Sequence, residues 1–178
     1  MESERSSILL ATDGSESAGA ATRMAVELAA ATGDRLLVVT VWHELRGDFG
    51  MPLTGLFPDL VEIERRHATD VGAAVVTQAG RAGVEVETVL RQGTPAREIC
   101  NVARERSPRM IVIGAQGWNA FERAVFGSVS NRVLHRAACP VLVVPGVLQP
   151  AGEGRAPTGG GAVDGADVDE PVAVGPAA

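Results

Sequence analysis

Short apolar runs alternate with longer amphipathic stretches between residues 7 and 145 of the chain. We predict that these runs are strands; they cover 7–12, 36–42, 84–90, 110–113 and 141–144. Apolar runs of this length are typical of strands that are covered on both faces, as in a parallel sheet. Apolar and polar residues alternate in 84–90, so we expect this strand to have one face that is more exposed to solvent and to lie at an edge of the sheet.

Apolar residues recur at helical spacing between these runs. Helices are expected to begin near residues 17, 60, 95 and 128. Gly33 is the expected end of the first helix and Gly80 or Gly83 that of the second, while Thr94 is the expected N-cap of the third. The connection 43–58 is long for a compact domain, and such loops are usually functional or mobile. The βαβαβαβαβ pattern predicts an α/β fold, a doubly wound parallel sheet with helices on both faces.

Composition narrows the class of protein. Hydrophobic residues make up 46 %, charged residues 21 % and aromatic residues 3 % of the chain, so the core is expected to consist of Ala, Val, Leu and Ile. The net charge of −6 argues against nucleic acid or an anionic membrane as partner. Cys100 and Cys139 form neither a disulfide framework nor a zinc site and read as small buried hydrophobes. With no signal peptide or membrane-spanning run apparent, we expect a soluble cytoplasmic protein.

The last part of the chain differs from the rest. Residues 147–178 are rich in Gly, Ala and Pro, carry several acidic residues, and have almost no apolar side chain larger than Val. Such a segment buries too little surface to offset its ordering entropy. We therefore expect one folded domain, 1–146, followed by a disordered tail, 147–178.

The stretch with the clearest chemistry is the apolar run that ends in Gly114 and Gly117 and is followed by Gly127 and Ser128. A buried strand that leads into a glycine loop and a helix N-terminus suits a phosphate, because glycine permits close approach and the first helical N–H groups lack internal partners. It is not a Walker A loop, since no Lys follows the last glycine, and it lacks the G-x-G opening of dinucleotide sites. The alternative is an ordinary turn between strand and helix.

A second glycine-bearing strand end lies at Ala11-Thr12-Asp13-Gly14. Ligands in open parallel sheets bind at the carboxyl ends of strands where the strand order reverses. If the first and fourth strands are neighbours, a crevice between Asp13 and Gly114 is the natural ligand site. The alternative for Asp13 is a turn residue that caps the following helix.

The spacing Gly114-x2-Gly117-x9-Gly127-Ser128 resembles the ATP-binding motif of the universal stress protein family. Segments 8–15, 93–99, 127–134 and 139–144 resemble further parts of that family in the same order. The resemblance implies an adenine nucleotide alpha hydrolase-like domain with a five-stranded sheet in the order 3-2-1-4-5. It also implies a homodimer in which strand five, Val141–Val144, pairs with its copy.

The same resemblance implies a set of nucleotide-binding residues. Asp13 would contact the ribose, Ala11 and Thr12 would line the adenine side, and Val41 would hold the base. The phosphates would be wrapped by Gly114, Gly117, Gly127, Ser128 and Val129, with Ser130 close by. In agreement, a carboxylate suits a pair of ribose hydroxyls, and Ser128 offers both an N–H and a hydroxyl group. The alternative for Val41 is an ordinary core residue, since a valine in a strand is usually part of the core.

Several polar and aromatic residues outside this set also bear on the ligand site. Gln116 stands where many relatives carry a basic or small residue, and Arg123 or Arg132 would be the compensating cation. Trp118 either covers the nucleotide or shields the loop. His67 and His135 fall within helices far from the glycine loop in sequence, whereas His43 follows a strand on the expected ligand side.

These residues do not form a set of nucleophile, base and orienting group, so no catalytic residue is expected and any ATP hydrolysis should be slow. The sequence thus predicts an ATP-binding, nucleotide-dependent regulatory protein of the stress-response type that acts as a homodimer, with ATP and Mg²⁺ as its ligands. The alternatives are a dimerisation module that binds no nucleotide, a member that prefers AMP or cAMP, and a slow ATPase.

Overall fold

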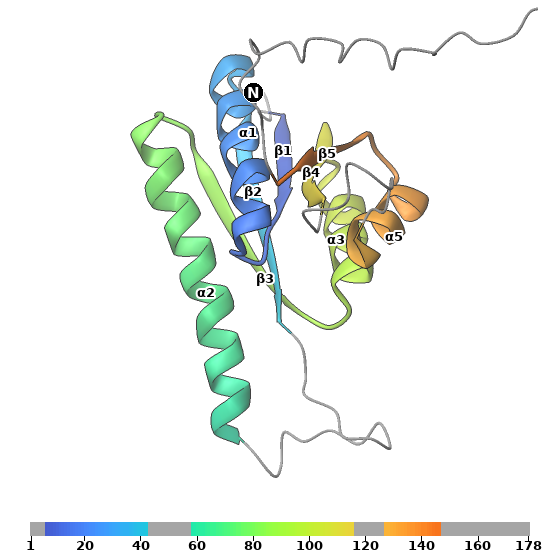
Figure 1. The fold of residues 1–178 in the computed structure, drawn as a ribbon. Coiled ribbons are helices and arrows are strands. Elements are labelled where there is room, and N and C mark those ends of the chain that lie inside the picture. The colour runs from blue at the N-terminus through green and yellow to red at the C-terminus, as the bar shows by residue number, and fades with distance from the viewer. Residues whose placement is uncertain (1–5, 43–57, 116–126, 147–178) are drawn as a thin grey trace, which may run out of the picture. The chain divides into compact units, whose positions relative to one another are not determined.

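The computed structural model describes residues 6–42, 58–115 and 127–146 of the chain. These ranges contain one sheet and the helices that cover it (Figure 1). The strands are β1 (Ser7–Ala11), β2 (Arg35–Trp42), β3 (Val86–Gln92), β4 (Met110–Ala115) and β5 (Val141–Pro145). The helices are α1 (Glu16–Thr32), α2 (Pro58–Arg81), α3 (Pro95–Arg106) and α5 (Ser128–Arg136). Of the expected connection 43–58, only Pro58 is described, as the first residue of α2. The expected tail, 147–178, lies outside the described residues.

The sheet has five parallel strands in the order β3-β2-β1-β4-β5, which confirms the predicted topology. β1 is the central strand, and Ala11 lies opposite Val39 of β2 and Ile113 of β4. The condition for a crevice between the first and fourth strands is therefore met. β3 lies at one edge, as its alternating pattern predicted, and β5 lies at the other.

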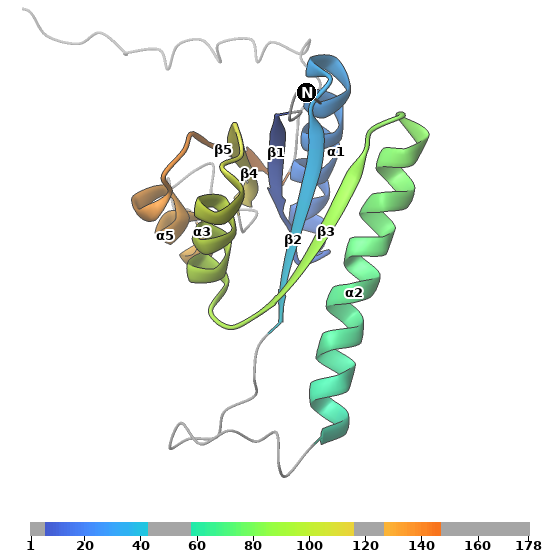
Figure 2. The ribbon, with the colours of Figure 1, turned by 180° about the vertical axis from the view of Figure 1, so that it is seen from behind.

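Alternate side chains of the strands supply two separate cores. Ile8 and Leu10 of β1 pack in the core beneath α1 and α2, whereas Leu9 and Ala11 pack in the core beneath α3 and α5. Figures 1 and 2 show these two layers of helices from opposite sides of the sheet. Because successive side chains of a strand point to opposite faces, a strand that is apolar throughout must be covered twice. This arrangement confirms the doubly wound fold.

The helix boundaries follow local signals, with two corrections. Gly33 ends α1 in the left-handed conformation, with a φ of 71°, as expected. Ser15 is the N-cap of α1 and accepts a hydrogen bond from the Ala18 N–H, so the helix begins slightly earlier than predicted and Asp13 is not its cap. Thr94 occupies the N-cap position of α3, but its side chain makes no capping hydrogen bond.

Both cysteines contribute to the core beneath α3 and α5. Cys100 is buried, as predicted, whereas Cys139 is only partly buried. Burial raises the pKa of the Cys100 thiol above its ordinary value and outweighs the opposing influence of Arg104 and Arg136. Burial, and to a lesser extent the neighbouring Cys100, raises the pKa of the Cys139 thiol as well. Within the described ranges, the helices include none that is long and apolar enough to cross a membrane.

Candidate functional site

The carboxyl end of β1 turns sharply into α1. Thr12 is buried, with an exposed fraction of 8 %; its N–H donates to the Val39 carbonyl at 3.2 Å. Its hydroxyl accepts a hydrogen bond from the Gly14 N–H, also at 3.2 Å. The strand end is thus held to β2 by the backbone and to the turn by the side chain, which fixes the position of Asp13 between them.

Asp13 is exposed at this turn, and one of its carboxylate oxygens is engaged. Oδ1 accepts hydrogen bonds from the Ser15 N–H at 3.0 Å and from the Ser15 hydroxyl at 2.6 Å. Both bonds end on Oδ1, so neither of them uses Oδ2, the oxygen that could accept from a donor such as a ribose hydroxyl. Asp13 therefore supports the residue that caps α1, and its carboxylate is oriented before any ligand arrives.

Gly14 adopts a φ of 76° in the same turn, a conformation that favours glycine. A Cβ atom at this position would lie 2.5 Å from Cγ2 of Val71 on α2. The turn that carries Asp13 is therefore packed directly against Val71, a residue of α2 that lies more than fifty positions further along the chain.

Gly114, near the end of β4, is packed against the first turn of α1. A Cβ atom at Gly114 would lie 3.1 Å from the Ser17 carbonyl oxygen and 3.3 Å from the Ala18 Cα. A side chain at this position would press on the backbone of α1, so glycine suits the close approach of α1 to β4 irrespective of any phosphate. This packing brings the carboxyl end of β4 and the N-terminus of α1 together.

The N-terminus of α5 supplies the other part of the motif. Gly127 is the N-cap, with a φ of −55°, so its backbone does not require glycine. Its carbonyl accepts hydrogen bonds from the Asn131 N–H and the Ser130 hydroxyl, each at 3.0 Å. Ser130 is 2 % exposed and its hydroxyl is used within the helix, whereas Ser128 is exposed and Val129 is half-buried. The N–H groups of this first turn lack intrahelical acceptors and can bind an anion.

The remaining predicted residues are divided between the core and the chain outside the described ranges. Ala11 is buried, and Val41 is half-buried against the core beneath α3 and α5, which accounts for both as packing residues. Outside the described residues lie Gly117, Gln116, Trp118, Arg123 and His43, so the centre of the glycine loop stays a prediction. Among the described residues, the structure brings together the ends of β1 and β4.

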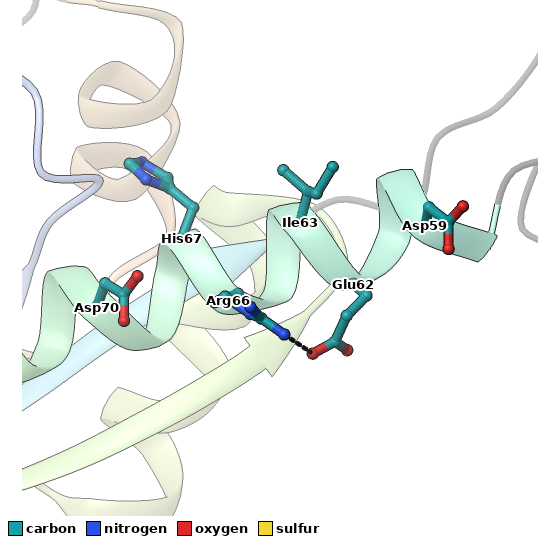
Figure 3. Close-up of a pocket in the computed structure, with 6 residues that line it drawn as sticks. All are labelled: Asp59, Glu62, Ile63, Arg66, His67 and Asp70. Carbon is teal, nitrogen blue, oxygen red and sulfur yellow. Dashed lines mark ion pairs between the residues drawn. The ribbon is translucent and has the colours of Figure 1, made fainter.

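Helix α2 contributes residues that the sequence interpretation placed away from the site. A groove of about 360 Å³ separates α1 from α2, and its lining includes Thr12, Gly14 and Ser15 together with His67 and Asp70. His67 and Asp70 also line an adjoining groove of about 430 Å³ on the N-terminal half of α2, shown in Figure 3. His67 thus lies beside the β1–α1 turn. Local sequence offered no signal for this, because it depends on how α2 packs on the sheet.

Two arginines on this part of α2, Arg65 and Arg66, form ion pairs with Glu62 of the same helix. Glu62 accepts two hydrogen bonds of 2.9 Å from the Arg65 guanidinium and lies 3.6 Å from that of Arg66. The hydrogen bond from Arg65 is the main reason why the pKa of Glu62 lies below its ordinary value. In the part of the chain that the structure describes, no cluster of three or more His, Cys, Asp or Glu side chains is arranged to hold a metal ion.

Comparison with known proteins identifies a family. The model of the universal stress protein family matches residues 4–145. A universal stress protein of Bacillus subtilis is 32 % identical over 144 residues, covering 77 % of this chain and 97 % of that protein.

Solved structures of the same family have the same fold. One from Burkholderia pseudomallei is 31 % identical, with a TM-score of 0.63 over 82 % of this chain and 99 % of its own. A second, from Archaeoglobus fulgidus in complex with dAMP, is 26 % identical, with a TM-score of 0.58 over 79 % of this chain and 98 % of its own.

Proposed function

Because the chain belongs to the universal stress protein family, we propose that it is a cytoplasmic, nucleotide-dependent regulatory protein of the stress response that binds ATP with Mg²⁺ as a homodimer. The observation that carries this proposal is the pairing of β1 with β4, which places the Asp13 turn beside the end of the strand that leads into the glycine motif. An oriented carboxylate suits the hydroxyl groups of a ribose, and a helix N-terminus suits phosphates, so together they suit a nucleotide.

The proposed contacts follow from the described geometry. Oδ2 of Asp13 accepts from a ribose hydroxyl, and the first-turn N–H groups of α5 at Ser128 and Val129 donate to phosphate oxygens. Mg²⁺ accompanies the phosphates, as is usual for this ion at nucleotide sites. The related Archaeoglobus fulgidus protein was solved in complex with dAMP, which supports an adenine nucleotide as the ligand.

The proposed dimer uses β5. This strand is paired with β4 on one side and forms an edge of the sheet on the other. Leu142 is 36 % exposed, and Val141 and Val143 are half-buried. An apolar edge strand of this kind is prone to pair with another strand, and a second copy of the chain supplies an identical one.

Calorimetric titration with Mg-ATP tests the proposal. Wild-type protein should bind, and Asp13→Asn should weaken binding about 10- to 100-fold, because a hydrogen bond to a charged acceptor is lost while the Asn oxygen still supports Ser15. Glu27→Gln, which removes an exposed carboxylate from α1, is the matched control and should bind as the wild type does. Absence of binding at millimolar Mg-ATP would overturn the proposal, and equal affinities of wild type and Asp13→Asn would remove Asp13 from it.

A second candidate function is a dimerisation module that binds no nucleotide. It is favoured by the finding that close packing accounts for glycine at both Gly14 and Gly114 without any ligand. This candidate predicts a dimer that releases no nucleotide on denaturation and gives no heat with ATP, AMP or cAMP. Mass spectrometry of the supernatant after denaturation would also identify which of these nucleotides is carried.

A further inference from the structure

Helices α3 and α5 lie side by side on one face of the sheet, where they cover the core that contains Cys100 (Figures 1 and 2). The side of α3 towards β3 carries paired charges. Glu105 forms an ion pair with Arg91 of β3, and Arg106 forms one with Glu87 of the same strand. These two charged residues of α3 therefore have their partners on the sheet.

A different side of α3 carries two further arginines. Arg97 and Arg104 are seven residues apart, close to two helical turns, so they share one face of α3. Arg104 is exposed, and its guanidinium donates to the Cys100 carbonyl at 3.2 Å and to the Asn101 side chain at 2.7 Å. The side chain of Arg97 is 73 % exposed and forms an ion pair of 3.8 Å with Glu98. Most of the hydrogen-bonding capacity of this face is therefore directed to solvent.

Helix α5 adds two arginines beside this face. Arg132 and Arg136 are four residues apart, so they lie on one side of α5, and both are exposed. Arg104 and Arg136 both lie close enough to the Cys100 thiol to oppose the rise in its pKa that burial causes. The last turns of α3 and α5 therefore bring these two guanidinium groups to the same region of the surface.

The four exposed arginines, hereafter the arginine surface, concentrate positive charge on a chain whose net charge is −6. Helix α5 contains no Asp or Glu, and within the described residues neither of its arginines forms an ion pair with a carboxylate. Neighbouring like charges repel each other, and each guanidinium presents a planar fork of donors that matches a carboxylate. An anionic partner would relieve the repulsion. The members of this surface are Arg97, Arg104, Arg132 and Arg136.

A short acidic protein segment suits the arginine surface better than a nucleic acid or a membrane does. Neither α3 nor α5 contains Phe, Trp or Tyr, the side chains on which the bases of single strands stack. A duplex or a membrane is an extended polyanion and would also meet the rest of this acidic chain. Arg132 and Arg136 are separated by about 6 Å along the helix axis. Alternate side chains of an extended peptide, at about 6.5–7 Å, have nearly the same spacing.

We propose that the arginine surface binds an extended acidic segment of a partner protein, with Asp or Glu at alternate positions. The carboxylates of the segment accept hydrogen bonds from the guanidinium groups along the line where α3 and α5 meet. This interaction goes beyond the proposed nucleotide binding, because it requires no nucleotide and involves neither Asp13 nor the glycine motif.

Fluorescence anisotropy tests the proposal with the full-length protein in the absence of nucleotide. The probe is a short peptide in which Asp and Ala alternate, labelled with an uncharged dye, at about 20 mM salt, where exposed charges are little screened. The wild type should bind it, and Arg97→Gln/Arg136→Gln should weaken binding about three- to thirtyfold, because two exposed ion pairs are lost. Arg23→Gln/Arg81→Gln is the matched control. It removes the same charge from exposed positions of α1 and α2, so it should bind as the wild type does.

Two results would overturn the inference directly. One is the absence of binding by the wild type at millimolar peptide. The other is an equal loss in the two double variants, which would indicate a response to net charge and not to this surface. The wild type gives an independent check, since its affinity for the peptide must fall as the salt concentration rises, and an unchanged affinity would refute ion pairing. Melting temperatures within about 2 °C of the wild type, expected for exposed positions, exclude unfolding as the cause of a loss.

Competing ligands identify the class of partner. Single-stranded DNA and vesicles that contain phosphatidylserine would be measured with the same proteins. If either binds the wild type more tightly than the peptide does and loses affinity in Arg97→Gln/Arg136→Gln, the proposed protein partner is wrong. Because no nucleotide is present, failure of this inference leaves the proposed function standing, and the Mg-ATP titration tests that function separately.

Discussion

The contact between Gly14 and Val71 allows a quantitative prediction for the variant Gly14→Ala. Alanine at a φ of 76° is strained by about 1–2 kcal/mol relative to glycine. The new Cβ atom would also lie 2.5 Å from Cγ2 of Val71, which is only 9 % exposed. Forcing a methyl group into a packed site typically costs about 1–3 kcal/mol. We therefore expect Gly14→Ala to lower the free energy of unfolding by about 2–5 kcal/mol.

Gly33→Ala separates the two contributions. Gly33 has nearly the same φ, 71°, but a Cβ atom there would have no neighbour within 4 Å. This control should lose only the strain of about 1–2 kcal/mol. Urea unfolding of both variants, with an unchanged dependence on urea concentration, gives the comparison. The double variant Gly14→Ala/Val71→Ala removes the overlapping methyl groups, so its cost should be about 1–3 kcal/mol less than the sum of the single costs.

The prediction fails if Gly14→Ala is no more destabilising than Gly33→Ala. That result would mean that α2 moves away from the turn at little cost. The packing of Val71 against Gly14 would then be too weak to hold the Asp13 turn in place.

Two further predictions concern the cysteines and the sheet edge. Burial raises the pKa of the Cys100 and Cys139 thiols, so above about pH 9, where unfolded thiols ionise, the unfolded state binds fewer protons and stability falls with rising pH. The decrease in unfolding free energy between pH 8 and pH 10 should be smaller in the double variant Cys100→Ala/Cys139→Ala than in the wild type. Equal decreases in the two proteins would mean that ionisation of the thiols does not cause the loss of stability. Leu142→Arg on β5 should convert the proposed dimer to a monomer in sedimentation experiments. Leu90→Arg is the control, because Leu90 is similarly exposed on the opposite edge strand, and it should leave the dimer intact. A dimer that persists in Leu142→Arg would argue against pairing through β5.

The elements of the fold could be predicted from the sequence because they depend on local patterns. An apolar run of strand length indicates a strand that other elements cover on both faces. Apolar residues at helical spacing indicate a helix that packs on the core along one face. Gly33, with its left-handed backbone, ends α1 for a reason contained in the residue itself. The order of the strands is different, because no local pattern states which strands are neighbours. It was predicted through the family resemblance and is confirmed by the pairing of β1 with β2 and β4.

The candidate site also has features that the sequence predicts and features that only the tertiary structure shows. Its glycines and Asp13 could be identified in the sequence because their spacing is a local property. Only the tertiary structure revealed that Gly114 is packed on Ser17, and that Ser15 rather than Asp13 caps α1 with Asp13 supporting it. The same holds for His67, which the sequence placed far from the glycine loop and which lies beside the Asp13 turn. These relations join residues brought together by packing on the sheet, so they depend on distances in space that no spacing along the chain encodes.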